Sequence, residues 1–254
     1  ICYNRGYHVV IFQSHEKYQR EVTDTQLLAS RRTDGLIITL SNETTRYEHI
    51  NSLIEGGIPV VMFDRVCKEI NTHKVVVDDY EGALCATEHL IDEGYTRIAH
   101  LSTSPVLSIT QQRLRGYRDA LKKHHIPVRK EWIVHCDFET CEIENAVRSL
   151  FSAGDRPNAI FASVERLAIG CLKVFKDMHL KIPDEVALVA FSDNPLNAFL
   201  DPPLTAVRQP TFEIGQKSAE LLIELIESKE NVKQFKTIEL KTRLDIRRSS
   251  CRRR

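Results

Sequence analysis

Short runs of apolar residues rich in Val and Ile alternate with longer amphipathic stretches along the chain. Apolar runs of this length are typical of buried strands, and the longer stretches repeat their apolar positions at helical spacing. The predicted strands cover residues 8–12, 35–40, 58–63, 74–77, 97–101, 132–136, 159–162, 186–191 and 236–246. The predicted helices cover residues 16–32, 47–55, 80–93, 111–124, 142–153, 167–178 and 211–227. The pattern therefore predicts an α/β fold.

Continuous apolar strands separated by helices are typical of parallel sheets that are covered on both faces. Strand–helix–strand units cross over with a right hand, so each sheet is expected to be doubly wound. About ten strands are too many for one lobe of ordinary size, which favours two smaller sheets with a cleft between them. The sequence contains no low-complexity linker. We therefore expect two lobes joined by several ordered segments rather than by one flexible tether.

The charge composition argues against a nucleic-acid-binding module. Lys plus Arg number 35 and Asp plus Glu number 35, so the formal net charge is zero. A domain that binds a duplex by itself normally has a basic face or a basic excess. The one basic cluster is the tail, at Arg247, Arg248 and residues 252–254, which we interpret as a disordered basic end rather than a phosphate contact.

The seven cysteines are spread along the chain with no CxxC pair. An odd, scattered set does not indicate a disulfide framework and fits a reducing cytoplasm. Cys136 and Cys141 lack the second His or Cys pair of a zinc pattern, so no metal site is expected. No apolar run approaches the ~20 residues of a membrane span, and no signal peptide is visible. The sequence begins without Met, and we expect upstream residues to precede it.

Polar residues follow the predicted strands at the positions where α/β proteins bind ligands. Ligands gather beyond the carboxyl ends of such strands, near the free N–H groups of helix N-termini. These positions hold Asp64 and Arg65, residues 102–104, Asp137 and Phe138, Ser163, Val164 and Glu165, and Ser192, Asp193 and Asn194. Carboxylates, an aromatic ring, hydroxyls and an amide would suit a polyhydroxylated or heterocyclic ligand.

Sequence signatures of catalysis are missing. The chain has no GxGxxG, no GxxxxGK[ST] phosphate loop, no GxSxG elbow and no HExxH. We find no histidine at a clear strand end beside a candidate nucleophile. The sequence therefore predicts a binding domain with neither enzymatic activity nor a cofactor.

A series of short motifs, weak singly, forms a strong pattern through its order and spacing. The motifs are RTDGLI (32–37), GIPVVMFDR (57–65), VVVDD (75–79), GALCATEHL (82–90), GYTRI (94–98), RLRGYRDAL (113–121), residues 159–170, IPDEVALVAFSD (182–193), PPLTAVRQP (202–210), IGQKSAELL (214–222) and the terminal strand. Across essentially its whole length, the chain resembles the effector-binding core of the lactose-repressor (LacI/GalR) family of transcription regulators.

The resemblance implies a periplasmic-binding-protein-like fold whose two lobes are joined by three crossover segments. The first lobe would contain residues 1–102 and 209–231, and the second would contain residues 103–208 and 232–254. Family members carry a helix-turn-helix DNA-binding headpiece before this core. Here the headpiece is missing, as is a first strand that helps to line the cleft. The zero net charge agrees, since the residues that read DNA would lie upstream.

The resemblance also implies a function. A small polar effector (a sugar, sugar phosphate or purine-like molecule) would bind between the lobes and control operator binding allosterically. The regulator would be a cytoplasmic homodimer. The alternative is a periplasmic sugar-binding protein of a transport system, which shares the fold. The seven cysteines and the absence of an export signal speak against this alternative.

Four residues match effector-contact positions of the family. Arg113 matches the arginine that grips effector hydroxyls or a carboxylate, for which the planar guanidinium is suited; its alternative is a solvated helix arginine, like Arg115. Phe138 matches an aromatic that stacks on the effector, with core packing as the alternative. Asp64 matches a cleft-facing acidic position, with a buried structural pair as the alternative. Arg65 belongs to the recurrent Asp-Arg pair of the family and could instead brace the lobes.

Two pairs of residues depart from the family pattern. Val164-Glu165 stands where the family commonly has Asn-Asp, and Ser192-Asp193 stands where it commonly has Asp-Asp. The first residue of each pair usually contacts effector. Valine and serine remove an acceptor and a charge, which leaves open a less hydroxyl-rich ligand, a phosphorylated ligand or a partner protein.

Overall fold

The chain divides into two compact units, each built from two segments of the sequence. In the computed structural model, residues 1–30, 33–152, 154–228, 232 and 234–252 are described. The first unit contains Ile1–Val77 and Pro210–Leu240, and the second contains Asp78–Gln209 and Lys241–Arg254. The polypeptide therefore passes between the units three times, as expected.

Two unit boundaries differ from the predicted ones. Residues 78–102 belong to the second unit rather than the first, because β4 (Ile98–Ser102) pairs with β6 (Ala159–Ala162) inside the second unit's sheet. Residues 232–240 belong to the first unit, because β9 (Thr237–Leu240) pairs with β3 (His73–Val77). The boundaries depend on which distant strands pair with each other. The local hydrophobic pattern does not indicate that pairing.

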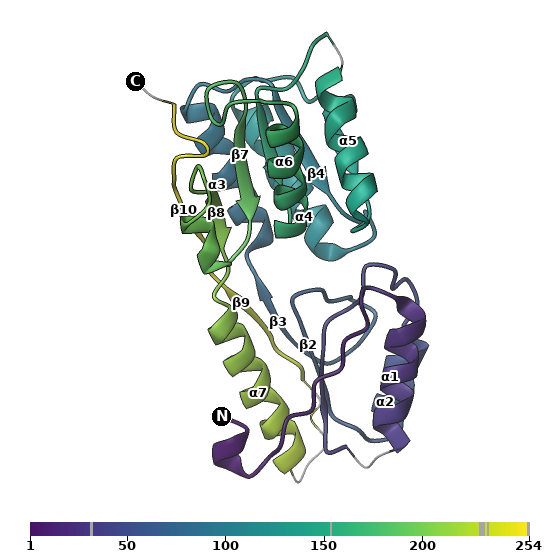
Figure 1. The fold of residues 1–254 in the computed structure, drawn as a ribbon. Coiled ribbons are helices and arrows are strands. Elements are labelled where there is room, and N and C mark those ends of the chain that lie inside the picture. The colour runs from purple at the N-terminus through teal and green to yellow at the C-terminus, as the bar shows by residue number, and fades with distance from the viewer. Residues whose placement is uncertain (31–32, 153, 229–231, 233, 253–254) are drawn as a thin grey trace. The chain divides into compact units, whose positions relative to one another are not determined.

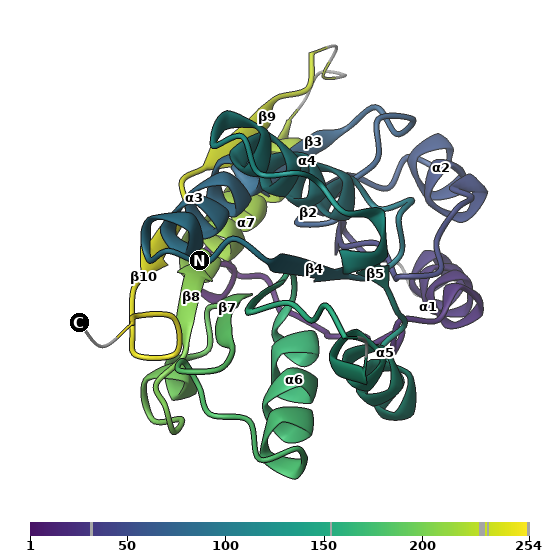
Figure 2. The ribbon, with the colours of Figure 1, turned by 90° about the horizontal axis from the view of Figure 1, so that it is seen from above.

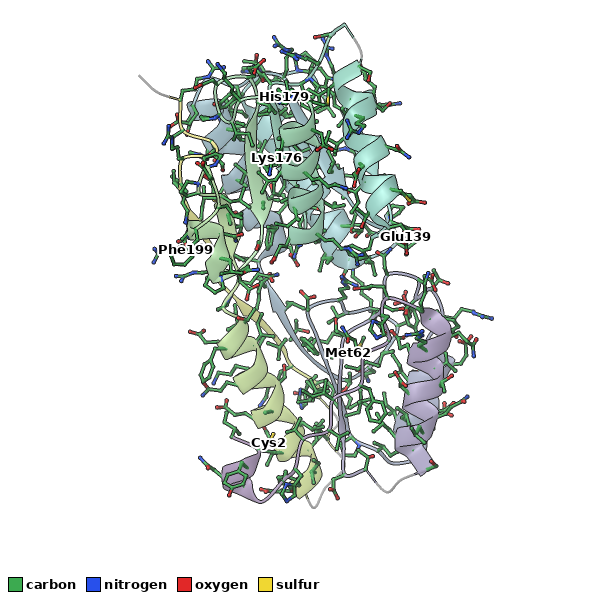
Figure 3. All side chains as sticks on the ribbon, viewed as in Figure 1. Cys2, Met62, Glu139, Lys176, His179 and Phe199 are labelled. Carbon is green, nitrogen blue, oxygen red and sulfur yellow. The ribbon has the colours of Figure 1, made fainter. Side chains whose placement is uncertain are left out.

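The first unit contains a four-stranded parallel sheet in the order β1-β2-β3-β9. β1 spans Leu36–Ile38 and β2 spans Val60–Phe63. The helices α1 (Tyr18–Ser30) and α2 (Glu48–Glu55) lie on one side of this sheet, and α7 (Thr211–Glu227) lies on the other (Figure 1). The short 3₁₀ helix η1 covers Tyr3–Arg5. Met62 is fully buried in the interior between these layers (Figure 3).

The predicted strand at residues 8–12 is not a strand in the structure. The segment is extended but unpaired, and Val9, Val10 and Ile11 are 67%, 72% and 87% exposed. A strand requires a neighbour for its backbone N–H and C=O groups. β1 and β9 are the edge strands of the described sheet, and neither pairs with this segment. The apolar composition of the run was therefore not sufficient to make it a strand.

The second unit contains a six-stranded sheet in the order β10-β8-β7-β6-β4-β5. The remaining strands are β5 (Ile133–His135), β7 (Ala187–Phe191), β8 (Thr205–Arg208) and β10 (Arg243–Asp245). All described pairings are parallel except that of β10 with β8. β8 was not among the predicted strands, and residues 236–246, predicted as one strand, contain the two strands β9 and β10.

Helices cover both faces of the second sheet. Figure 2 shows α3 (Asp79–Asp92) and α4 (Ser108–Lys123) on one side of β4, with α5 (Thr140–Ser152) and α6 (Glu165–Asp177) on the other. Two 3₁₀ helices, η2 (Lys130–Trp132) and η3 (Pro195–Ala198), lie in loops. β6 and β7 are buried along their whole lengths, which explains their continuous apolar sequence.

The basic tail is partly built into the second unit. Arg247 donates to the Leu204 carbonyl and pairs with Asp245. The backbone N–H of Arg252 donates to Glu93, and its guanidinium lies 4.3 Å from the ring centre of Tyr95. The expectation of a disordered end is therefore wrong for these two arginines, while residues 253–254 lie outside the described part of the chain.

Candidate functional site

Arg113 lies buried where several elements of the second unit meet. Its Nε donates to Asp79 Oδ1 at 2.7 Å, and its Nη2 lies 2.6 Å from the same oxygen. Its Nη1 donates to the Ser163 carbonyl at 2.5 Å, and Cζ lies 3.6 Å from the ring centre of Phe191. The side chain is 3% exposed, against 68% for Arg115. The alternative of a solvated helix arginine is therefore excluded.

Glu165 and Ser192, from the two pairs that depart from the family pattern, bind each other. Glu165 begins α6, and its Oε2 accepts from Ser192 Oγ at 2.8 Å. Its Oε1 accepts from Asn194 Nδ2 at 2.7 Å. Asn197 Nδ2 also donates to Ser192 Oγ, at 2.9 Å. These bonds fix a carboxylate at the ends of β6 and β7.

Val164 and Asp193 complete the two pairs. Val164 is the N-cap residue of α6, with extended backbone, and it packs against the hydrophobic core of the second unit. Asp193 is half-buried beside Ser192. The valine therefore contributes packing at a position where the family commonly has an amide.

A histidine that the sequence analysis missed ends β5. Ser102 Oγ lies 2.8 Å from His135 Nδ1, and the Thr103 carbonyl lies 3.2 Å from the same nitrogen. Because a carbonyl only accepts, Nδ1 carries the proton in this arrangement. Ser102 is fully buried, so it is not an accessible nucleophile. The signal in the sequence was the place of His135 next to the end of the predicted strand 132–136, which leads to Phe138.

Phe138 is half-buried rather than part of the core. The Arg166 guanidinium carbon lies 5.6 Å from its ring centre, a distance typical of a cation–π contact. Arg166 is itself exposed on α6. The alternative of simple core packing is therefore wrong, and one face of the Phe138 ring lies beside a charged group.

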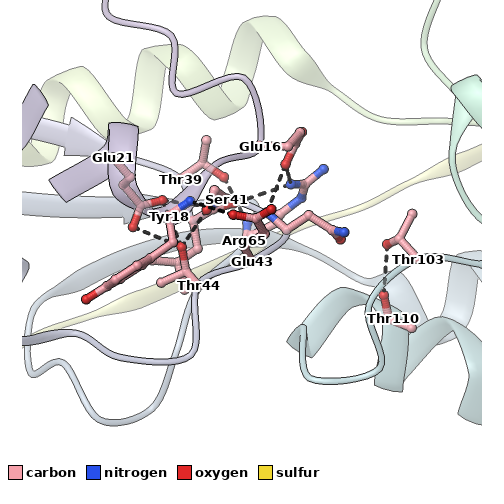
Figure 4. A network of polar contacts seen from close by, with 12 residues as sticks. Glu16, Tyr18, Glu21, Thr39, Ser41, Glu43, Thr44, Arg65, Thr103 and Thr110 are labelled. Carbon is pink, nitrogen blue, oxygen red and sulfur yellow. Dashed lines mark hydrogen bonds and ion pairs between the residues drawn. The ribbon is translucent and has the colours of Figure 1, made fainter. Parts of the chain in front are cut away.

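Asp64 and Arg65 follow β2 in the first unit. Asp64 has a positive φ of 55°, and its N–H donates to the Val75 carbonyl. Arg65 Nη1 donates to Glu16 Oε2 at 2.5 Å and lies 3.4 Å from the Leu40 carbonyl (Figure 4). The Arg65–Glu16 ion pair is thus made inside the first unit, where it ties the end of β2 to the segment before α1.

A buried network at the same edge of the first unit was also missed. Glu21 on α1 is 4% exposed and accepts from the Ser41 N–H at 2.6 Å and from Thr44 Oγ1 (Figure 4). It also accepts from His49 Nε2 at 2.8 Å. The network fixes the loop that follows β1. In the sequence, Glu21 has the spacing of a solvated helix position, so no local signal marked it.

A second glutamate holds the same loop. Glu43 accepts from Lys17 Nζ at 2.7 Å and from the Tyr18 N–H (Figure 4). The hydrogen bond from Lys17 lowers the pKa of Glu43, so the carboxylate stays ionised. In Figure 4, the separate bond between Thr103 and Thr110 belongs to the second unit, where it joins the end of β4 to α4.

The described residues form neither a metal cluster nor a helix that could span a membrane. No group of three or more His, Cys, Asp and Glu side chains there could hold a metal ion. No helix in the described part of the chain is long and apolar enough to span a bilayer.

Comparison with known proteins identifies the family. The model of the periplasmic binding protein-like domain matches residues 87–250. The HTH-type transcriptional repressor PurR of Vibrio vulnificus is 29% identical over 235 residues, which are 92% of this chain and 70% of the repressor. A solved structure from Burkholderia thailandensis, assigned as a ribose operon repressor, is 31% identical, with a TM-score of 0.85 over 96% of this chain and 88% of its own. This chain belongs to the LacI/GalR family.

Other LacI/GalR members support the same conclusion. The transcriptional regulator CelR, solved with cellobiose, is 27% identical, with a TM-score of 0.86 over 97% of this chain and 75% of its own. These relatives are transcription regulators rather than transport proteins or enzymes, which overturns the alternative of a periplasmic sugar-binding protein. The chain is the ligand-sensing core of a LacI/GalR regulator.

Proposed function

We propose that this core senses a small polar effector, a sugar, sugar phosphate or purine-like molecule, at the strand ends of its second unit. The observation that carries the proposal is the buried Arg113, which Asp79, the Ser163 carbonyl and the Phe191 ring hold in one orientation. A guanidinium fixed in this way presents donors in a rigid plane. Relatives solved or named with cellobiose or ribose support a ligand of this kind.

The other predicted residues have complementary roles in this proposal. Glu165 and Ser192 offer acceptors and a hydroxyl, while Phe138 offers an aromatic face on which a ring can stack. Val164 and Asp193 flank these groups. Asp64 and Arg65, at the strand ends of the first unit, are further predicted contacts. None of these roles requires a chemical step, so we propose that the protein binds its ligand without transforming it.

Regulation follows from differential affinity. An effector shifts an equilibrium between two states only by as much as it prefers one of them, typically ~1–3 kcal/mol of coupling. We propose that a homodimer in the cytoplasm transmits this shift to DNA-binding headpieces encoded upstream. Phe199, labelled in Figure 3, is 82% exposed, and Leu196 is 62% exposed; these apolar side chains support a contact with a second copy.

A ligand screen tests the effector site. Thermal unfolding is measured against neutral sugars, sugar phosphates and purines; a ligand at a hundred times its Kd stabilises by about 2.7 kcal/mol. The Arg113→Lys variant keeps a positive charge beside Asp79 but loses the planar donors, so the effector should bind at least about tenfold more weakly. Arg115→Ala, at an exposed position on the same helix, is the matched control. Unchanged affinity in Arg113→Lys contradicts the proposed role.

A further inference from the structure

The charged side chains described at the strand ends of the second unit determine which charge a ligand can carry there. From them we infer that this site takes an uncharged ligand, a neutral sugar or neutral heterocycle, and excludes phosphorylated and carboxylated ones. The inference rests on the function proposed above and narrows its ligand class. Four observations within the second unit support it.

The first observation is that Arg113 is already neutralised. Among the described residues it is the only arginine or lysine with a buried side chain, and its partner Asp79 is 6% exposed. The two contacts to Asp79 Oδ1, at 2.7 and 2.6 Å, pair the charges inside a medium that screens poorly. An anionic ligand would lie close to this carboxylate as well as to the guanidinium. Neutral hydroxyls and carbonyls accept from Arg113 without that repulsion.

The second observation is that Glu165 adds a carboxylate at the same edge. Each of its oxygens accepts a hydrogen bond, from Ser192 and from Asn194, so the carboxylate is held in a fixed position. A ligand with O–H or N–H groups can donate hydrogen bonds to the remaining lone pairs of the Glu165 carboxylate. A phosphate can offer few donors and would repel the carboxylate.

The third observation concerns the helix N-termini, which are natural anion sites. Glu165 lies in the first turn of α6, Asp79 and Glu81 lie in the first turn of α3, and Glu142 lies in the first turn of α5. The protein's own carboxylates therefore occupy the positions that favour anions. α4 has no acidic residue in its first turn, and it is the place where a phosphate would bind if the inference is wrong.

The fourth observation is the exposure of the remaining positive charge. Arg166 lies beside Phe138 but is exposed, so water and salt screen its charge. Asp137 and Asp193 are also at this edge and carry the opposite sign. The net local charge among the described residues is thus negative.

The experiment uses inorganic phosphate and two matched pairs of probes, ribose with ribose 5-phosphate and glucose with glucose 6-phosphate. Binding to the intact chain is measured by calorimetry at constant ionic strength, for the wild type and for Glu165→Gln and Asp79→Asn. The control is Asp177→Asn, which removes one negative charge from the other end of α6. Asp177 forms an exposed ion pair with Arg148 there. Glu165 is only half-buried, so Glu165→Gln should fold even if Asp79→Asn does not.

We expect no saturable phosphate binding to the wild type or to Asp177→Asn. In Glu165→Gln, phosphate or a phosphorylated sugar should bind at least about tenfold more tightly than in the wild type, since a nearby negative charge is removed. Tight, Arg113-dependent binding of a phosphorylated probe to the wild type overturns the inference, and so does the absence of any gain in Glu165→Gln. Failure of every compound in the thermal-shift screen would count against the proposed sensing function instead.

Discussion

At the scale of single residues, the site depends on partners that come from distant parts of the sequence. Arg113 and Asp79 are 34 positions apart, and Glu165 and Ser192 are 27 apart. The strand-end rule and the resemblance selected Arg113, Glu165 and Ser192, because each stands at a recognisable position beside a predicted strand or helix. Neither the resemblance nor the hydrophobic pattern indicated Asp79 as the partner of Arg113, because an acidic residue at a helix start is equally typical of a solvated cap.

Another residue, His100, shows how burial changes the pKa of a side chain. The ring is fully buried in β4, and neither ring nitrogen has a described hydrogen-bond partner. Its centre lies 5.0 Å from that of the stacked Tyr117 ring and 5.2 Å from that of the tilted Phe161 ring. Burial lowers the pKa of His100 to about 3, with a smaller contribution from the positive charge of Arg113. The ring is therefore neutral in the folded protein at every pH at which the protein is normally handled.

This lowered pKa predicts a pH dependence of stability. Between about pH 6.5 and 3 the unfolded chain binds a proton at His100 that the folded chain does not, so stability falls as the pH falls. In His100→Phe, the slope of the unfolding free energy against pH in this window should decrease by up to about 1.4 kcal/mol per pH unit. Urea unfolding between pH 7 and 4 measures the slope, with exposed His8→Gln as the control. An unchanged slope in His100→Phe would show that the ring is protonated in the folded state.

At the scale of elements, hydrophobic pattern located most strands and helices, and pairing decided the exceptions. Residues 8–12 have the composition of a strand but no partner, whereas β8 was overlooked in a loop-like sequence between Pro203 and Pro210. The apolar alternation of residues 236–246 was read as one strand, although its two halves join different sheets. Composition reports whether a segment can be buried, while hydrogen bonding to a neighbour determines whether it becomes a strand.

Helices α3 and α4 pack so closely at Gly116 that a larger residue there should destabilise the protein. A Cβ on Gly116 would collide with the Tyr80 carbonyl oxygen and would lie 2.9 Å from the Leu84 backbone nitrogen. Neither backbone atom can move without shifting α3. Gly116→Ala should therefore destabilise the protein by about 1–3 kcal/mol, despite the helix propensity of alanine.

The matched control is Gly215→Ala in α7. Among the described residues, no atom other than those of the adjoining residues and the nearby backbone of α7 lies within 4 Å of a Cβ at that position, so alanine should stabilise by up to about 1 kcal/mol. Chemical unfolding compares the two variants, and a stabilising effect of Gly116→Ala would contradict the described packing of the two helices.

At the scale of the whole molecule, neither unit is a continuous piece of sequence. The last segment returns to the second unit at Lys241, where β10 pairs with β8. Ser249 then donates to the Leu188 carbonyl, accepts from the Thr205 N–H, and is fully buried. This interleaving was expected, but the boundaries predicted at residues 102 and 231 lie elsewhere, at residues 77 and 240, because they depend on which sheet each strand joins.

Removal of the last segment tests this organisation. A chain that ends at Leu240 loses the β10 ladder and the Ser249 bonds, and the N–H of Thr205 is left buried without its acceptor. Each such group costs about 1–3 kcal/mol, so the truncated chain should lose most of its stability. Circular dichroism during thermal unfolding measures the loss. A truncated chain that unfolds at the temperature of the intact one would show that the second unit is complete without β10.

The sequence by itself determined the fold class and several strand-end positions, because apolar periodicity is a local property. The order of its motifs indicated the family, and the three passages of the chain followed from that resemblance. Only the tertiary structure decided which segments pair, that Arg113 is neutralised by Asp79, and that Glu165 and Ser192 share hydrogen bonds. Those facts depend on distances between residues far apart in the chain. The charge that a ligand meets is the sum of such neighbours, so it can be read only from the folded arrangement.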